Sequence, residues 1–170
     1  GAGGRDVHPN STCGVLIRVY PVDSFAGNAP AHEGDAGLSG IRRVIIAVRD
    51  LSHAVKVYGE MFALQTSPPA ADAERGVESA ICTPGGRGVI ELVSVKNPSR
   101  PFAAAVVSFL EARGEGMYAL VLDADEPAAA ARILAQRGVE SGPSADSDSV
   151  FEVSRNSAFG ALLRIEPRTP

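Results

Sequence analysis

The chain has 170 residues, of which 45% are apolar and 21% charged, and its formal net charge is -4. This length fits one compact domain, and the negative charge gives no reason to expect nucleic acid or an anionic membrane as a partner. No stretch approaches the roughly 20 apolar residues that span a bilayer. Cys13 and Cys82 do not make a disulfide framework, so we expect reduced thiols and a cytoplasmic protein.

The first part of the chain holds one isolated strand signal followed by a linker. The run GVLIRVYP (14–21) is typical of a strand. Residues 23–39 are rich in Gly, Ala and Pro and show no apolar period, which indicates a linker. We therefore expect a stray terminal strand in residues 1–22, a linker over 23–39 and one domain over 40–170.

A strand–helix–strand–strand unit is predicted over residues 40–97. The β-branched run RVIIAV (43–48) predicts a buried strand. Asp50 then supplies a helix cap. VESAICTP (77–84) and GVIELVSV (88–95) predict two further strands joined at a glycine turn.

The same order returns in the second half of the chain. The predicted elements there are a helix over 102–114, a strand over 117–122, a helix over 127–137 and strands over 150–154 and 160–167. Gly40 matches Gly116, which gives an offset of 116 − 40 = 76 residues between the two units. This duplication is one of pattern more than of identity.

A closer repeat links the two ends of the chain. NSTCGVLIRVYP (10–21) matches NSAFGALLRIEP (156–167) at Asn, Ser, Gly, Leu, Arg and Pro, with an offset of 156 − 10 = 146 residues. Either residues 1–22 are the remnant of a preceding similar module in a longer tandem protein, or their strand fills an open sheet edge of the domain. The sequence leaves both interpretations open.

With these residues placed, the chain resembles the vicinal oxygen chelate superfamily, which has the glyoxalase and bleomycin-resistance fold, and most of all methylmalonyl-CoA epimerase-like proteins. The stretches that carry the resemblance are IRRVIIAVRDLSHAVKVYGEMFAL, VIELVSV, FLEARGEGMYALVLDADEPAAAARILAQRGV and SAFGALLRIEP. The resemblance implies an α+β fold in which two βαβββ modules, at about 40–97 and 115–167, form a curved mixed sheet around a cavity. It also implies a homodimer, unless the chain is a module of a longer protein.

Active relatives hold a divalent metal through one side chain from each of four strands. By resemblance, these positions fall on Arg43, Glu91, Ala119 (or Tyr118 if the register slips by one) and Arg164, so one of the four keeps a ligand type. A catalytic divalent metal needs about three donors from His, Cys, Asp or Glu, and protonated arginine is not one. We therefore expect no metal and no cofactor.

The cavity residues Arg43, Glu91, Tyr118 and Arg164 admit two interpretations. In the structural one, Glu91 is buried and pairs with Arg43 or Arg164 in place of the metal. In the functional one, an arginine clamps the carboxylate or phosphate of a small ligand. Glu78 is a weak catalytic candidate near the proton-transfer position of epimerase relatives, with Ser79 as its alternative.

The functional hypothesis is a metal-free glyoxalase-fold domain that binds a small molecule, anionic if an arginine clamps it, or serves as a non-catalytic part of a tandem protein. The alternative is a divalent-metal-dependent lyase, isomerase, epimerase or dioxygenase of the same superfamily. Whether the chain is an enzyme is left open by the sequence.

Overall fold

The computed structural model describes residues 4–21, 36–85 and 88–168. Within these residues, nine strands form one sheet in the order β4-β6-β7-β3-β8-β11-β10-β9, with β5 paired to β6. Most of the predicted linker lies in residues 22–35, outside the described ranges. Of the helices in the described ranges, none has the length and apolarity needed to cross a membrane.

The first half of the sheet follows the predicted order. Its elements are β3 (Leu38–Ala47), α1 (Leu51–Lys56), the π-helix η2 (Val57–Met61), β4 (Gln65–Thr66), β5 (Ala70–Asp72), β6 (Val77–Thr83) and β7 (Val89–Val95). Asp50 caps α1 as predicted, because its Oδ1 accepts the backbone N–H of His53 at 3.0 Å. The first strand begins at Leu38, inside the range predicted as linker.

The second half repeats this arrangement after a connecting helix. Its elements are α2 (Pro101–Arg113), β8 (Gly116–Ala124), α3 (Pro127–Gln136), β9 (Ser141–Ser144), β10 (Ser147–Val153) and β11 (Leu163–Pro167). Gly114 ends α2 with a φ of 78°, a left-handed conformation that favours glycine.

The two halves are joined through their first strands. β3 and β8 pair antiparallel at the centre of the sheet. On either side of this pair, β7 runs parallel to β3 and β11 runs parallel to β8. The α+β fold of two like modules that share one mixed sheet is therefore confirmed.

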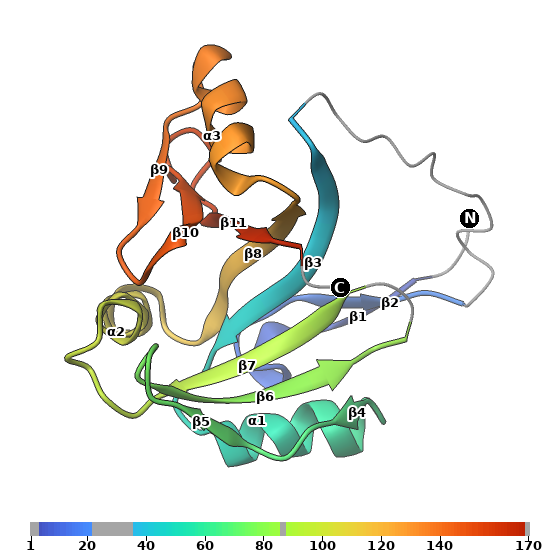
Figure 1. Ribbon diagram of the computed structural model, residues 1–170. Helices are drawn as coiled ribbons and strands as arrows, with labels where there is room; N and C mark the ends of the chain where they lie inside the picture. Colours follow the sequence, from blue (N-terminus) through green and yellow to red (C-terminus); the bar gives the residue numbers. More distant parts are fainter. Residues whose placement is uncertain (1–3, 22–35, 86–87, 169–170) are drawn as a thin grey trace.

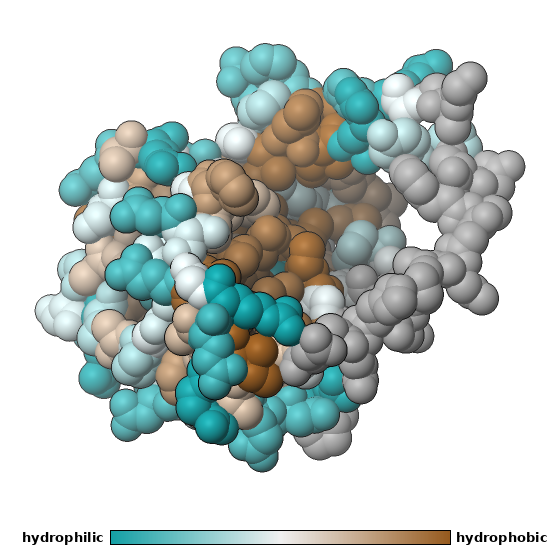
Figure 2. Space-filling view, turned by 90° about the horizontal axis from the view of Figure 1, so that it is seen from above, coloured by the Kyte–Doolittle hydropathy of each residue, from teal (hydrophilic) through white to brown (hydrophobic). Residues whose placement is uncertain are grey.

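The helices cover the two faces of the sheet unequally (Figure 1). We call the face that packs against α2 the inner face, and the face that packs against α1 and α3 the outer face. Phe102 and Val106 of α2 share one buried cluster with Ile45 and Val121. Two further clusters lie beneath α1 and α3 on the outer face. Figure 2 shows apolar residues gathered around a hollow on one side of the molecule.

Residues 5–19 form a separate hairpin. Its elements are β1 (Arg5–Val7), the short 3-10 helix η1 (Pro9–Ser11) and β2 (Ile17–Val19). β2 pairs antiparallel with β1, and within the described residues neither strand joins the nine-stranded sheet. The N-terminal strand thus does not fill an open edge of that sheet.

Candidate functional site: a buried network of ion pairs

Glu91 and Arg164 occupy equivalent positions in the two modules. Glu91 of β7 pairs with Ile45, and Arg164 of β11 pairs with Val121. Ile45 and Val121 are separated by 121 − 45 = 76 residues, the same offset as the two predicted units. Arg43 lies two residues before Ile45 and so shares its face of β3. The sheet therefore brings Arg43, Glu91 and Arg164 to the inner face.

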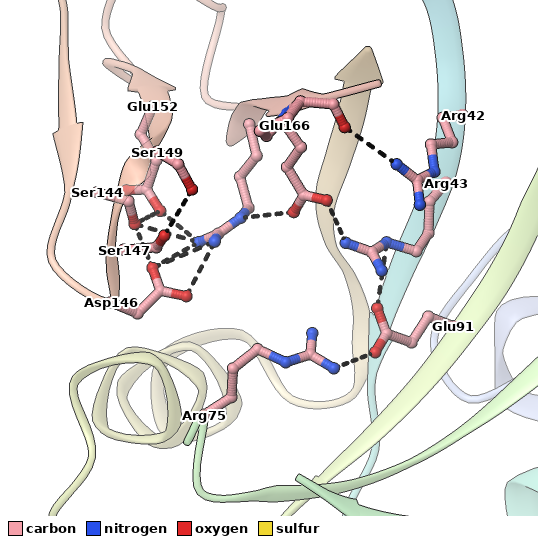
Figure 3. Close-up of polar contacts among 12 residues, drawn as sticks. Arg42, Arg43, Arg75, Glu91, Ser144, Asp146, Ser147, Ser149, Glu152 and Glu166 are labelled. Carbon is pink, nitrogen blue, oxygen red and sulfur yellow. Dashed lines mark hydrogen bonds and ion pairs between the residues drawn. The ribbon is translucent and has the colours of Figure 1, made fainter. Parts of the chain in front are cut away.

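Glu91 is buried and bound by two arginines (Figure 3). Arg75 Nη2 donates to its Oε1 at 2.5 Å, and Arg43 Nε lies 3.3 Å from its Oε2. Arg75 sits in the turn before β6, where Asp72 accepts from both its backbone N–H and its Nε. Both oxygens of Glu91 therefore face a guanidinium group.

Arg164 is only 3% exposed and lies among acidic groups of β10 and the turn that precedes it. Its Nη2 is 2.9 Å from Asp146 Oδ2, and its Nη1 is 2.6 Å from Glu152 Oε1. Burial by itself would raise the pKa of Asp146, but hydrogen bonds from Arg164 and Ser144 outweigh burial and hold the pKa below its ordinary value. Asp146 is therefore held as a carboxylate.

Glu166 connects the two modules (Figure 3). Arg43 Nη2 donates to Glu166 Oε2 at 2.6 Å, and Arg164 Nε lies 3.5 Å from Glu166 Oε1. The chain of contacts therefore runs without interruption from Arg75 through Glu91 and Arg43 to Glu166 and Arg164. We call this set, with Asp146, the ion-pair network.

The ion-pair network is balanced in formal charge. Its side chains, each at most 19% exposed, are three arginines and three carboxylates: Arg43, Arg75, Arg164, Glu91, Asp146 and Glu166. Of these six side chains, those predicted from the sequence are Arg43, Glu91 and Arg164. The carboxylates of Asp146 and Glu166 were not predicted, and neither was the role of Glu166 as the link between Arg43 and Arg164. The ion pair of Glu91 with Arg43 is present, whereas Arg164 pairs with other carboxylates.

The donor set does not fit a divalent metal. Arg43, Arg164 and Ala119 stand at three of the four strand positions that the family resemblance identifies, and the oxygens of Glu91 already face Arg43 and Arg75. Among residues 4–21, 36–85 and 88–168, no three His, Cys, Asp or Glu side chains are grouped to hold a metal ion. A cation placed at Glu91 would be repelled by two fixed positive charges.

Tyr118 borders the ion-pair network but belongs to the apolar cluster. Its ring meets Phe102 and Phe109 edge to face, with centroids 5.6 and 5.5 Å apart. Burial raises the pKa of Tyr118 to about 12. The guanidinium groups of Arg75 and Arg164 lie 5.1 and 5.2 Å from the centre of the Phe102 ring. An aromatic side chain of α2 thus covers the ion-pair network on the inner face.

Glu78 lies on the opposite face from Glu91. Along β6, Val77 packs beneath α2 and Ala80 beneath α1, so the alternation of a strand puts Glu78 on the outer face. There Glu78 Oε2 is 2.8 Å from Lys96 Nζ. Ser79, its alternative, shares the inner face with Val77. The structure does not bring Glu78 together with Arg43, Glu91 and Arg164.

Four residues that bind the predicted arginines or Glu91 were not predicted from the sequence: Arg75, Asp146, Glu152 and Glu166. Glu166 had a usable signal, because it lies two residues after Arg164 in a strand and so points to the same face. Arg75 and Asp146 lie in turns, where no periodicity indicates which way a side chain points. Their part in the network depends on contacts between residues far apart in the sequence.

Two cavities lie next to Tyr118, between α2, β8 and the turn that precedes β11, and Glu152 of β10 also lines the larger one. Their volumes are about 470 and about 260 Å³, and Arg113, Tyr118, Arg155 and Leu162 line both. Arg155 also lies over the ring of Tyr118, 6.0 Å from its centroid. The shared lining therefore presents two guanidinium groups next to an aromatic side chain.

The chain is similar in fold to several solved structures. Methylmalonyl-CoA epimerase from Mycobacterium tuberculosis has 22% identity and a TM-score of 0.64, over 81% of this chain and 93% of that one. The hypothetical protein BH1468 from Bacillus halodurans C-125 has 18% identity and a TM-score of 0.65, over 77% and 95%. A single-residue variant of Streptomyces coelicolor methylmalonyl-CoA epimerase, in complex with 2-nitronate-propionyl-CoA, has 19% identity and a TM-score of 0.62, over 78% and 99%.

The family model for the glyoxalase/bleomycin resistance protein/dioxygenase superfamily matches residues 42–150. These residues run from Arg42 in β3 to Val150 in β10 and so include most of both modules. A comparison with curated proteins found no match. The chain belongs to the glyoxalase/bleomycin resistance protein/dioxygenase superfamily.

Proposed function

We propose that this chain is a metal-independent domain of its superfamily, in which the ion-pair network takes the structural place of the divalent metal. The observation that supports this most is the position of Arg43 and Arg164 on either side of Glu166, with Glu91 held by Arg43 and Arg75. Guanidinium groups stay protonated at every physiological pH. A cation placed at Glu91 would therefore meet the fixed positive charges of Arg43 and Arg75.

In this role the network ties the two modules together. Arg43 belongs to the first module, Glu166 to the second, and their contact is 2.6 Å long. A buried ion pair adds little net stability compared with apolar packing, but it penalises arrangements that leave one charge without its partner. The network therefore specifies how the modules sit against each other more than it increases the stability of the fold.

Metal-dependent chemistry is the alternative that a titration would reveal. Under our proposal, cobalt, nickel, zinc or manganese at micromolar concentration leaves the melting temperature unchanged. A bound metal would instead raise the melting temperature. At a metal concentration about one hundred times the dissociation constant, the free energy of unfolding would increase by about 2.7 kcal/mol. Such a rise, abolished by Glu91→Gln, would show that the proposal is wrong.

A second candidate function is the binding of a small anionic molecule in the two cavities beside Tyr118. Arg113 and Arg155 line both cavities, and guanidinium groups bind phosphates and carboxylates in bidentate fashion. One structure of similar fold is a methylmalonyl-CoA epimerase in complex with methylmalonyl-CoA and NH4+. For this chain, that likeness favours a ligand with phosphate or carboxylate groups.

Isothermal titration with coenzyme A and with inorganic pyrophosphate tests this second function. Arg113→Gln and Arg155→Gln should each weaken binding about tenfold or more, because each removes a charged hydrogen-bond donor. Arg132→Gln is the matched control, because Arg132 is an exposed arginine of α3 outside the lining of both cavities. Equal weakening by all three changes would indicate attraction by overall charge and not a site.

A further inference from the structure

The N-terminal hairpin repeats the last hairpin of the domain in its strand register. β1 and β2 pair as Arg5 with Val19, Asp6 with Arg18 and Val7 with Ile17. β10 and β11 pair as Phe151 with Ile165, Glu152 with Arg164 and Val153 with Leu163. Each pair of the second set lies 146 residues after its counterpart (152 − 6 = 146 and 164 − 18 = 146). The ion pair of Arg18 with Asp6 likewise corresponds to that of Arg164 with Glu152.

The turn between the two strands is repeated as well. The backbone N–H of Gly14 donates to the backbone oxygen of Pro9 at 2.9 Å, and the backbone N–H of Gly160 donates to the backbone oxygen of Arg155 at 2.7 Å. Cys13 and Phe159, at the corresponding position, both have a φ of 52°. A left-handed residue other than glycine is uncommon, so its recurrence at the same place indicates that residues 5–21 and 151–167 are two copies of one structural element.

The two copies differ in what covers them. Ile165 is fully buried beneath α3 and Leu162 is 8% exposed, whereas their counterparts Val19 and Leu16 are 49% and 61% exposed. β11 pairs with β8 on one edge and β10 on the other. For β2, β1 is the single strand partner among the described residues. β2 therefore has the sequence of an interior strand, but among the described residues it pairs along one edge alone. On the face that Ile17 and Val19 share, Ile17 packs against the cluster beneath α1 while Val19 is half exposed.

We propose that residues 5–21 are the closing hairpin of a second glyoxalase-type module, and that the edge of β2 opposite β1, together with Leu16 and Val19, is the surface onto which the rest of that module docks. The partner is a strand–helix–strand segment that resembles β8, α3 and β9. Its first strand pairs parallel to β2, as β8 does to β11. Its helix covers Val19, as α3 covers Ile165.

Charge complementarity identifies the partner further. Arg164 is 3% exposed and bound by Asp146 from the turn before β10, whereas Arg18 is 53% exposed. The docked segment therefore presents a carboxylate to Arg18 from the corresponding turn. A second copy of this chain does not meet this requirement, because its own β11 already occupies the edge of β8 and its own Arg164 already binds Asp146.

The turn of the hairpin packs against the rest of this chain. The Tyr58 hydroxyl donates to the backbone oxygen of Thr12 at 3.2 Å, and Cys13 is buried in the cluster beneath α1. A Cβ added to Gly14 would lie 1.8 Å from the backbone oxygen of Glu115, so the turn packs against backbone there. These contacts fix β2 relative to the first module of this chain. The two domains of the resulting tandem would meet at this turn.

The test is a chain extended at its N-terminus by a second copy of residues 116–150, joined directly to Arg5. The junction follows from the offset, because 151 − 146 = 5. We expect the appended segment to fold on the hairpin and to slow hydrogen exchange at the backbone amides of β2 by at least about tenfold relative to the unextended chain. In the unextended chain, Val19→Asp should leave the melting temperature unchanged, because this side chain is half exposed. In the extended chain it should abolish the added protection.

Unchanged exchange at β2, while the amides of β3 and β8 stay protected, would overturn the proposal.

If the extended chain does not fold, a second variant decides the question. In it, residues 5–19 replace residues 151–165, so that Arg18 meets Asp146 while Glu166 is kept. Cooperative unfolding of this variant supports the proposal, because it shows that the hairpin closes a glyoxalase-type module. Loss of cooperative unfolding in this variant overturns it. Neither arm involves a metal or an anion, so both outcomes are independent of the function proposed for the ion-pair network.

Discussion

Glu91 and Arg164 occupy the same position of the two modules and carry opposite charges. Each pairs, in parallel register, with the equivalent residue of its module's first strand, Ile45 for Glu91 and Val121 for Arg164. They do not contact each other directly, since Arg43 and Glu166 lie between them. Charge therefore alternates through these four side chains from one module to the other.

Removal of Glu91 should destabilise the protein strongly. Glu91→Ala removes the carboxylate that the largely buried Arg43 and Arg75 share. Loss of one partner of a buried pair costs about 3–5 kcal/mol, measured as the free energy of unfolding in urea. Glu78→Ala is the control, because the ion pair with Lys96 is more exposed and contributes about 0–1 kcal/mol. Equal effects of the two changes would contradict a buried role for Glu91.

Stability should fall in acid, in part through Asp146. The pKa of Asp146 is lower in the folded protein than its ordinary value, because the hydrogen bonds from Arg164 and Ser144 outweigh burial. The unfolded chain therefore binds the proton first as the pH falls. The stability that Asp146 contributes is complete above a pH of about 4 and is lost as the pH falls through the folded-state pKa. The free energy of unfolding in urea, measured from about pH 7 to about pH 2, should fall less steeply for Asp146→Asn than for the native chain. Identical slopes for the two proteins would refute this.

A metal site should be recoverable by substitution. Arg43→His, Ala119→His and Arg164→Glu, combined with the native Glu91, restore donors at the four strand positions that the family resemblance identifies. We expect this variant to melt at a higher temperature with micromolar zinc or cobalt, while the native chain does not respond. The same variant with Glu91→Gln is the control, and it should lose most of the response. A metal response of the native chain equal to that of the variant would contradict the prediction.

Tyr118 should matter as a packing residue. Its ring contacts Phe102 and Phe109 and is buried. Tyr118→Ala should cost about 3–5 kcal/mol of unfolding free energy, as for other large-to-small changes of buried aromatic residues. Tyr118→Phe keeps the ring and should cost less than about 1.5 kcal/mol. A larger loss in Tyr118→Phe would show that the hydroxyl group, and not the ring, stabilises this region.

The two cysteine thiols should be unreactive in the folded protein. Burial raises the pKa of Cys13 and of Cys82 to about 11, compared with about 8.5 in an unfolded chain. The stabilising effect of the buried neutral thiols is therefore complete below about pH 8.5 and is lost as the pH rises toward about 11. A disulfide reagent at about pH 8 should modify neither thiol until urea unfolds the chain. The exposed position of Ser99→Cys supplies a reactive control, and native thiols that react at its rate would contradict the prediction.

The order of strands and helices could be predicted from the sequence because it depends on local chemistry. The β-branched run at 43–48 lies within β3 except for its last residue, and GVIELVSV contains β7. Asp50 caps a helix, and Gly114 ends another. Each of these signals acts over a few residues, so none of them needs tertiary contacts to form. The start of β3 at Leu38 was missed, because the pairing of Leu38 with Ala124 comes from a strand 86 residues away (124 − 38 = 86).

The sequence by itself determined the family and the duplication, since these follow from residue types and their order along the chain. That Arg43 and Arg164 stand in place of metal donors stays a prediction from the family resemblance. Only the tertiary structure decided which charges meet. Arg75 and Asp146 enter the ion-pair network from turns, and Glu166 joins Arg43 across 123 residues of sequence. The structure also decided that the hairpin of residues 5–21 stands apart from the main sheet. Ion pairing depends on distances of a few ångströms, and such distances between remote residues are set by how the two modules pack.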